Sequence, residues 1–332
     1  MPLSRREFLF LTSAGLISTA YKKPDPIVMT INGPVKARLL GKTLIHEHFL
    51  VDFIGADKIN HSRWNRADVV KKVLPFLLEA NQYGVETIFD CTPAYLGRDV
   101  ELLKMLRDKS NLQIVTNTGY YGAVDNKYLP AHAFSETAEQ LAKRWIREFE
   151  KGIDGSNIRP GFIKISVNSG PLSELHKKLV KAAAITHLAT GLTICSHTGP
   201  AIPAIEEIKL LQENKVDPSA FVWVHAQSEI DKNYHQKAAV IGSWISLDGI
   251  GWGDIENYVD SIDRLKRAGL LHKVLVSHDA GWYKPEEVDG GNFTGFTSIF
   301  TQLIPTLEKK GFTEEDFKQL LVINPAEAFA LT

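Results

Sequence analysis

Short apolar runs alternate with longer segments of helical periodicity through most of the chain. Each run is apolar at nearly every position rather than at every second one, which is typical of parallel strands that are buried on both faces. Eight such runs lie at residues 43–48, 87–92, 114–119, 161–166, 192–197, 221–226, 244–249 and 274–279. Segments with one apolar helical face separate them, for example 67–83, 135–151, 172–189 and 255–268. The pattern predicts an α/β protein with a parallel sheet that is covered by helices.

Two architectures can hold eight strand–helix units. An open, doubly wound sheet needs a glycine-rich phosphate turn after an early strand, and none follows either of the first two runs. A (β/α)8 barrel, or TIM barrel, is built from eight such units in about 250 residues. We therefore predict a (β/α)8 barrel that forms a single catalytic domain over residues 21–332. A short N-terminal hairpin is expected at 27–38, with its turn at Asn32-Gly33.

Residues 1–20 resemble an export signal of the twin-arginine type. Arg5 and Arg6 precede the apolar stretch 8–20, and this stretch ends in small residues, as a cleavage site does. The stretch is too short to span a bilayer comfortably. A basic amphipathic helix is the alternative interpretation. We expect the protein to be exported by the twin-arginine (Tat) route and to be periplasmic or extracellular.

Composition excludes several classes of function. The formal net charge is −1, so the chain has no electrostatic footprint for nucleic acid or for an anionic membrane. Only two cysteines occur, Cys91 and Cys195, and both lie within apolar runs. A disulfide scaffold is thereby excluded, and both thiols are expected to be small buried groups. A small molecule is the expected binding partner.

Ionisable side chains stand in or at the end of five of the apolar runs. Buried strands are where such residues should be rare, because removing a charge from water costs several kcal/mol unless the charge is paired or bound to metal. The carboxyl ends of parallel strands meet at one edge, so these side chains are expected to converge. The predicted metal ligands are His46, His48, Lys164, His197, His225 and Asp279.

The residue types and their spacing point to metal chemistry. His46 and His48 share one face of a strand, since alternate residues point the same way. Lys164 lies inside a buried run, where a lysine tends to lose its charge and can react with carbon dioxide. The resulting carbamate has two oxygens and can bridge two metal ions. Nitrogen and oxygen ligands without thiolate suit Zn, Mn, Co or Fe. A lysine paired with a buried acid and a polar strand end are the structural alternatives.

Residues beyond the ligand set complete the predicted site. Five aromatic residues follow the third, seventh and eighth runs and are expected to line a substrate pocket. They are Tyr120, Tyr121, Trp252, Trp282 and Tyr283. Most other histidines, including His176 and His235, are expected on the surface. His278 is the exception, because it precedes Asp279 and is expected to lie behind the ligands.

Six motifs, taken in order along the chain, resemble those of the phosphotriesterase family of the amidohydrolase superfamily. They are TINGPV…LGKTLIHEHF (30–49), GFIKIS (161–166), SHTG (196–199), VHAQ (224–227), SHD (277–279) and NPAEAFA (324–330). The resemblance extends from about residue 28 to the end of the chain, and the combination is far more specific than any single motif. It implies a (β/α)8 barrel with two divalent metal ions, which are bridged by a hydroxide and by N6-carboxylated Lys164.

The resemblance also assigns roles. By motif position, His46, His48 and Asp279 would hold the buried metal ion, and His197 and His225 the more exposed one. Metal-activated hydroxide would attack the substrate, and Asp279 would accept the proton. Asp248 matches the family's acid at the end of strand 7, which members often follow with a charged or basic residue. Here Gly249 follows it. A homodimer is also implied as plausible.

The sequence therefore predicts a binuclear metal-dependent hydrolase that cleaves an ester-type bond, namely a phosphoester, a carboxylic ester or a lactone. Zinc is the first expectation for the metal. Two alternatives stay open: a mononuclear amidohydrolase that acts on C–N bonds, and a metal-containing binding protein without turnover. A bridging lysine argues against the first alternative, and a proton acceptor such as Asp279 argues against the second.

Overall fold

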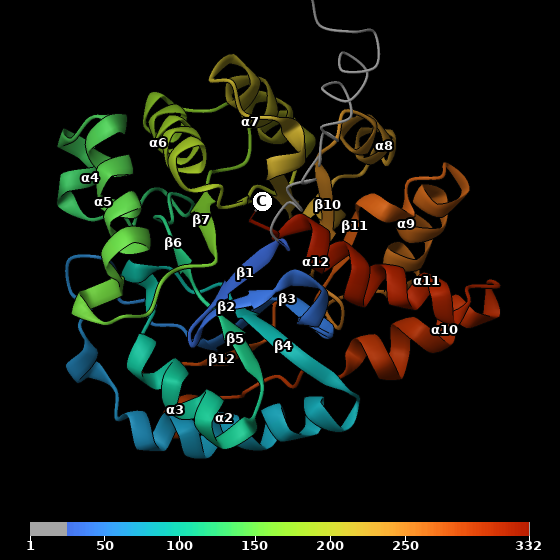
Figure 1. Cartoon of the computed structure of the whole chain (residues 1–332), viewed down its shortest axis with the longest axis horizontal. Coiled ribbons are helices and arrows are strands. Elements are labelled where there is room, and N and C mark those ends of the chain that lie inside the picture. The colour runs from blue at the N-terminus through green and yellow to red at the C-terminus, as the bar shows by residue number, and fades with distance from the viewer. Residues whose placement is uncertain (1–24, 332) are drawn as a thin grey trace, which may run out of the picture.

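The computed structural model describes residues 25–331 (Figure 1). The predicted export signal, residues 1–20, lies outside the described residues. The strands are β1 (Ile27–Thr30), β2 (Gly33–Lys36), β3 (Lys42–Leu50), β4 (Val85–Asp90), β5 (Gln113–Val115), β6 (Asn117–Thr118), β7 (Phe162–Ser166), β8 (Ile194–His197), β9 (Phe221–Val224), β10 (Trp244–Leu247), β11 (Val274–Val276) and β12 (Gly281–Tyr283). The helices are α2 (Arg66–Gln82), α3 (Val100–Ser110), α4 (Ala131–Ser135), α5 (Ala138–Lys151), α6 (Glu174–Thr190), α7 (Ala201–Glu213), α8 (Asn233–Val240), α9 (Ile255–Arg267), α10 (Ile304–Lys309), α11 (Glu314–Lys318) and α12 (Asn324–Ala328). None of the described helices is both long and apolar enough to cross a membrane.

The strands form two parallel sheets and one hairpin. Six strands pair in the order β11-β10-β9-β8-β7-β6, and four pair in the order β12-β3-β4-β5. Each of the eight apolar runs contributes a strand, and helices alternate with strands along the chain. The prediction of an α/β protein with parallel strands is thus confirmed. The helices lie around the outside of the strands in Figure 1.

The third and eighth runs are each associated with two short strands instead of one. Thr116 alone separates β5, which pairs with β4, from β6, which pairs with β7. After β11 the chain adds β12, in which Gly281 pairs with His48 of β3. A Cβ on Gly281 would lie 1.9 Å from the carbonyl oxygen of His48, so this close approach requires glycine. Between β11 and β12, the amide of Asp279 donates to the carbonyl of His46 at 3.0 Å.

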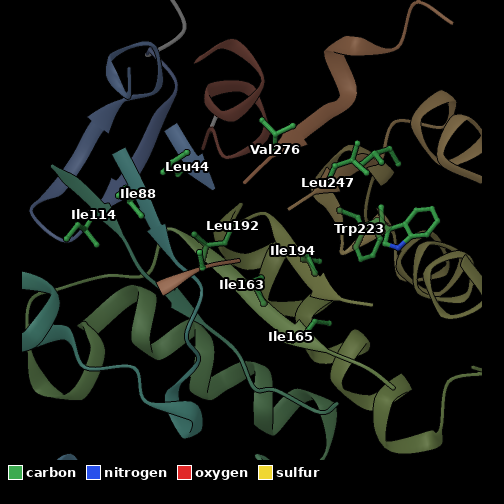
Figure 2. Close-up of a cluster of buried hydrophobic side chains, with 14 of the residues drawn as sticks. Leu44, Ile88, Ile114, Ile163, Ile165, Leu192, Ile194, Trp223, Leu247 and Val276 are labelled. Atoms are coloured by element: carbon green, nitrogen blue, oxygen red, sulfur yellow. The ribbon is translucent and has the colours of Figure 1, made fainter. Parts of the chain in front are cut away.

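Both faces of the strands are buried, as the continuous apolar runs predict. One set of alternate residues packs beneath the helices, and Figure 2 shows members such as Leu44, Ile163 and Trp223. The other set forms an inner cluster that contains residues of both sheets. Within it, the rings of Phe89 (β4) and Phe162 (β7) lie 5.5 Å apart. The inner faces of the two sheets therefore share one hydrophobic cluster.

The hairpin forms where the sequence predicts it, but its turn is shifted. Thr30 pairs with Gly33, so Ile31 and Asn32 form the turn, rather than Asn32-Gly33. Gly33 has a φ of 103°, which explains why glycine occupies the first position of β2. The hairpin also contacts the end of the described chain, because Leu331 exchanges two backbone hydrogen bonds with Ile27.

Local capping decides where one predicted helix begins. The hydroxyl of Thr137 accepts from the amide of Gln140, and the side chain of Gln140 accepts from the amide of Thr137. This capping box starts α5 at Ala138. The predicted segment 135–151 thus corresponds to α5, which begins three residues later than predicted, while Ser135 is the last residue of α4.

Candidate metal centre

The structure brings all six predicted ligands together at the carboxyl ends of the strands. His46 and His48 lie on β3, Lys164 on β7 and His197 at the end of β8, while His225 and Asp279 follow β9 and β11. Nζ of Lys164 donates to Nε2 of His46 at 3.2 Å. The rings of His197 and His225 meet at a centroid distance of 4.3 Å. The residues thus converge from both sheets, while their roles as ligands stay predictions.

Asp279 lies at the middle of this group. Its Oδ1 is 3.1 Å from Nε2 of His48 and 3.7 Å from Nε2 of His46, and its Oδ2 is 3.9 Å from Nε2 of His225. Burial acts to raise the pKa of Asp279, but the neighbouring histidines outweigh it and hold the pKa well below its usual range. The carboxylate is therefore ionised and faces three imidazole nitrogens.

Asp248 orients two of these imidazoles from behind. It is fully buried, and its carboxylate lies 2.7 Å from Nδ1 of His225 and 3.1 Å from Nδ1 of His46. Burial opposes its charge, yet the two histidines hold its pKa well below the ordinary value, so the carboxylate accepts from both rings. Each ring then turns Nε2 toward Asp279. The predicted position of Asp248 behind the ligands agrees with this geometry.

A second contact orients His48. Its Nδ1 lies 2.8 Å from the hydroxyl of Thr92, and that hydroxyl can donate to the carbonyl of Leu50 at 3.1 Å. When Thr92 accepts from Nδ1 of His48, Nε2 keeps a lone pair that can bind a metal cation. When Nε2 carries the proton instead, it donates to the Asp279 carboxylate 3.1 Å away.

The donor set fits divalent metal ions. One ligand atom each from His46, His225 and Asp279 lie within 4.8 Å of one another. Burial, and then the charge of Lys164, lower the pKa of His46 to about 4, so its imidazole is neutral and able to act as a ligand. Burial opposes the charged form of His225, but Asp248 and Asp279 raise its pKa. The negative charges of Asp248 and Asp279, which favour a proton on His225, also favour a metal cation beside it.

Two of the converging residues have a left-handed backbone. The φ angles are 62° at His225 and 50° at Asp279, a conformation that is uncommon outside glycine and that clusters at functional sites. Two indoles hold the second of these residues. Nε1 of Trp282 donates to the carbonyl of Asp279 at 2.9 Å, and Nε1 of Trp252 lies 3.2 Å from the same oxygen.

Glu47 is a buried residue of the site that sequence reasoning missed. Its carboxylate accepts from the hydroxyl of Ser277, from the amide and Nδ1 of His278 and from the amide of Ala280. It therefore ties β3 to the segment that carries Asp279. Its place between two histidines in a buried run was the available signal, because an acid there must have partners. His278 is buried, and its Nε2 accepts from the amide of Ile299, while its predicted role behind the ligands stays a prediction.

Two hollows adjoin the centre, and His197, His225 and Asp279 line both. The larger has a volume of about 490 Å³ and extends over the ends of β7, β8 and β9. The smaller has a volume of about 50 Å³ and is the space among the six predicted ligands themselves, with Phe53, Tyr121, Trp282 and two aliphatic residues completing its wall.

Some of the predicted pocket residues lie at the small hollow, and others lie elsewhere. Tyr121 and Trp282 line the small hollow, and Trp252 is 49% exposed beside it, with its ring 6.4 Å from that of Trp282. Tyr120 points the opposite way from Tyr121 and packs against Trp145. The prediction for Tyr120 is therefore wrong, because neighbouring residues of an extended segment face opposite sides.

Three further sequence interpretations need correction. Tyr283 lies in an outer hollow with Asp68 of α2, since it is two residues beyond Gly281 on the edge strand β12. His176 and His235 are buried rather than on the surface. Their Nε2 atoms donate to the carbonyls of Gly122 and Ala226, so both act as structural donors.

Gly249, the departure from the family's usual pattern, has a structural explanation. A Cβ at this position would lie 2.7 Å from Nε2 of Gln227 and 2.7 Å from the hydroxyl of Tyr258. The hydroxyl of Tyr258 also donates to the carbonyl of Gly249 at 2.6 Å. A side chain at this position would displace the ends of Gln227 and Tyr258, and Gln227 contacts Asp248 here.

Comparison with known proteins agrees with the motifs. The Phosphotriesterase family profile matches residues 26–329. The chain belongs to the phosphotriesterase family. It is 28% identical to a phosphotriesterase homology protein of Escherichia coli (strain K12), over 87% of this chain and 98% of the relative. It is 27% identical to an aryldialkylphosphatase of Saccharolobus solfataricus, over 89% and 97% of the two chains. It is also 27% identical to an N-acetyltaurine hydrolase of Xenopus tropicalis, over 90% and 97%.

Family membership and the converging His and Asp donors together make the chain a metal-dependent hydrolase of the phosphotriesterase family. The names of the relatives differ in the bond that is cleaved, since one is a phosphatase and another a hydrolase of an N-acetyl compound. The family alone therefore leaves the bond type open.

Proposed function

We propose that this chain is a binuclear hydrolase on a closed (β/α)8 barrel and that it cleaves an ester-type bond. The observation that carries the proposal is the convergence of His46, His48 and His225 on Asp279, with Lys164 beside them. Closure of the barrel is supported by the two sheets, which share an inner hydrophobic cluster and adjoin at Thr116.

The residues on the page would divide between two metal ions, with Zn the first expectation. His46, His48 and Asp279 would hold one, His197 and His225 the other, and N6-carboxylated Lys164 would bridge them. Bound metal ions of this kind activate a water molecule for attack and polarise the bond that is cleaved.

The chain's own residues supply positioning and proton transfer. Asp248 and Thr92 hold the imidazoles so that Nε2 faces the centre. Asp279 is ionised and borders both hollows, so its carboxylate can accept the proton of the attacking water and release it toward solvent. Hydrolysis of an ester forms one bond from the water oxygen to the acyl carbon or phosphorus and breaks the bond to the alcohol oxygen. That oxygen leaves with a proton.

A second candidate is hydrolysis of a C–N bond. It is favoured by the relatives that are named N-acetyltaurine hydrolase, because an N-acetyl compound is an amide. The same centre suits it, since an amide carbonyl is attacked in the same way and the amine takes the proton. The leaving group alone distinguishes the two candidates.

Metal analysis combined with a substrate panel tests the proposal. Protein purified without chelator is expected to hold two metal ions per chain. It is expected to hydrolyse at least one of the aryl phosphotriesters, carboxylic esters, lactones or N-acyl amides offered. Asp279→Asn should retain the fold and lose about 100-fold or more in kcat, as the loss of a positioned proton acceptor does. Two bound ions without turnover of any class would instead favour a metal-containing binding protein.

A further inference from the structure

The ring of His197 is held differently from the other three imidazoles of the centre. A buried carboxylate or hydroxyl contacts each of those three at its Nδ1 atom from behind. Within the described chain, the ring of His197 has one hydrogen-bond partner, the hydroxyl of Tyr121, which lies 3.1 Å from Nδ1. Tyr121 stands on the wall of the small hollow rather than behind the ring. The direction of the His197 ring therefore depends on the backbone that carries it.

Glu207 contacts the residues on both sides of His197. It lies in the middle of α7 and is fully buried. Its carboxyl group is 2.6 Å from the hydroxyl of Thr198 and also contacts the hydroxyl of Ser196. Because side chains alternate along an extended segment, those of Ser196 and Thr198 point toward the helix when His197 points into the centre. One buried side chain thus holds both chain neighbours of a proposed ligand.

The hydrogen bonds of this group are complete only when the carboxyl group of Glu207 is protonated. The hydroxyl of Thr198 is also 3.0 Å from the carbonyl of Ser196, so three contacts join the three residues. With a proton on Glu207, Ser196 donates to one carboxyl oxygen, and the other carboxyl oxygen donates to Thr198. Thr198 then donates to the carbonyl of Ser196. An ionised carboxylate leaves two protons for the three contacts. Burial acts in the same direction, because it raises the pKa of Glu207 to about 8.

Backbone hydrogen bonds fix the same segment from its other sides. The carbonyl of His197 accepts from the amide of Val167 at 3.0 Å, just beyond the end of β7. The amide of Gly199 donates to the carbonyl of Val224, the last residue of β9, at 3.1 Å. The main chain around His197 is therefore tied to both neighbouring strands, and Glu207 ties it to α7 as well.

We infer that Glu207 is a positioning residue of the centre: its carboxyl group holds both chain neighbours of His197 and thereby directs that ring toward the more exposed metal ion. The inference rests on the proposed function and deepens it, because it gives the more exposed ion a support that the buried ion does not share. The histidines proposed for the buried ion are held by other side chains. Loss of Glu207 should therefore affect the two ions unequally.

Metal titration tests this asymmetry. Co²⁺ is added to the metal-free full chain, and the visible absorption of the bound ion is followed together with the metal content. Glu207→Leu removes the carboxyl group and should weaken binding of one of the two ions by about 10- to 100-fold, as is usual when a group that supports a ligand is lost. The affinity of the other ion should stay close to that of wild type. Glu207→Gln should restore most of the lost affinity, because its amide can accept from one hydroxyl and donate to the other.

Two further variants complete the titration. Glu213→Leu is the matched control, because Glu213 is exposed at the end of the same helix, and it should leave both affinities unchanged. Should Glu207→Leu not fold, Ser196→Ala removes one of the two hydroxyls that Glu207 holds, and it should weaken the same ion by about 10-fold. In protein that binds two ions, an equal loss of both, or no loss of either, would overturn the inference.

The ring of His197 can also be observed without metal or turnover, which separates this inference from the proposed function. Its centroid lies 5.1 Å from that of Tyr121, so the two rings should give nuclear Overhauser effects in metal-free protein labelled at histidine and tyrosine. Glu207→Leu should weaken these effects several-fold, and Glu207→Gln should retain them. That result supports the inference even where wild-type protein binds fewer than two ions or hydrolyses nothing. Unchanged effects in Glu207→Leu would overturn the inference even where hydrolysis is found.

Discussion

The carboxylate of Asp248 lies 2.7 Å from Nδ1 of His225. Because it also reaches Nδ1 of His46, one buried acid orients imidazoles from both parallel sheets. In an Asp248→Asn variant the side-chain oxygen can accept from one ring only, and the amide N–H₂ then opposes the other ring's N–H. We expect metal affinity to fall about 10- to 100-fold, as is usual when a partner behind a ligand is lost.

Competition with a metal-binding dye would measure this change. Asp260→Asn is a matched control, since Asp260 lies on the exposed side of α9 and pairs with Arg264. Equal metal affinity in the wild-type and Asp248 variants would contradict the orienting role.

Lys164→Ala tests the bridge between the proposed metal ions. Lys164 is buried beside His46, and its removal should lower bound metal from two equivalents toward one or none. Wild-type protein loaded in ¹³C-labelled bicarbonate should show a carbamate carbon signal in the NMR spectrum, and the variant should not. Lys177→Ala, at a half-exposed position on α6, serves as the control. Unchanged stoichiometry in the Lys164 variant would exclude bridging.

Glu207 links stability to pH. Burial raises its pKa to about 8, and its carboxyl group contacts the hydroxyls of Ser196 and Thr198. Because the folded state holds this proton more tightly than the unfolded chain does, the associated stability is complete below about pH 4.5. It is lost as the pH rises toward 8. In Glu207→Gln the free energy of unfolding should therefore decline less between pH 5 and pH 8.

Chemical denaturation at both pH values measures this difference. Glu213→Gln is the matched control, because Glu213 is exposed on the same helix. A Glu207 variant with the same pH dependence as wild type would show that this carboxyl group is not held protonated in the folded state.

Export by the twin-arginine route is a further proposal. A fusion of residues 1–25 to a folded reporter should reach the periplasm, and replacement of both Arg5 and Arg6 by lysine should abolish export. A reporter that is still exported with both lysines would count against this route.

The residues of the metal centre could be predicted from the sequence more readily than those of the substrate pocket, for a physical reason. His46, Lys164 and Asp279 are ionisable residues in buried runs, and such residues have few explanations other than binding. Tyr120 and Tyr121 are both aromatic and differ only in which side of an extended segment they face, so the hydrophobic pattern cannot tell which one reaches the site. Glu47 acquires its role from His278, whose contact depends on how distant strands adjoin rather than on any local pattern.

Because the strands form two sheets, the candidate metal centre links one sheet to the other. His46 and His48 belong to one sheet, Lys164 and His197 to the other, and the amide of Asp279 bonds to the carbonyl of His46 where the two adjoin. A metal ion held by residues from both sheets would couple their local opening. Amide hydrogen exchange along this boundary should then slow on metal loading, so the protection of a few backbone amides would report occupancy of the site.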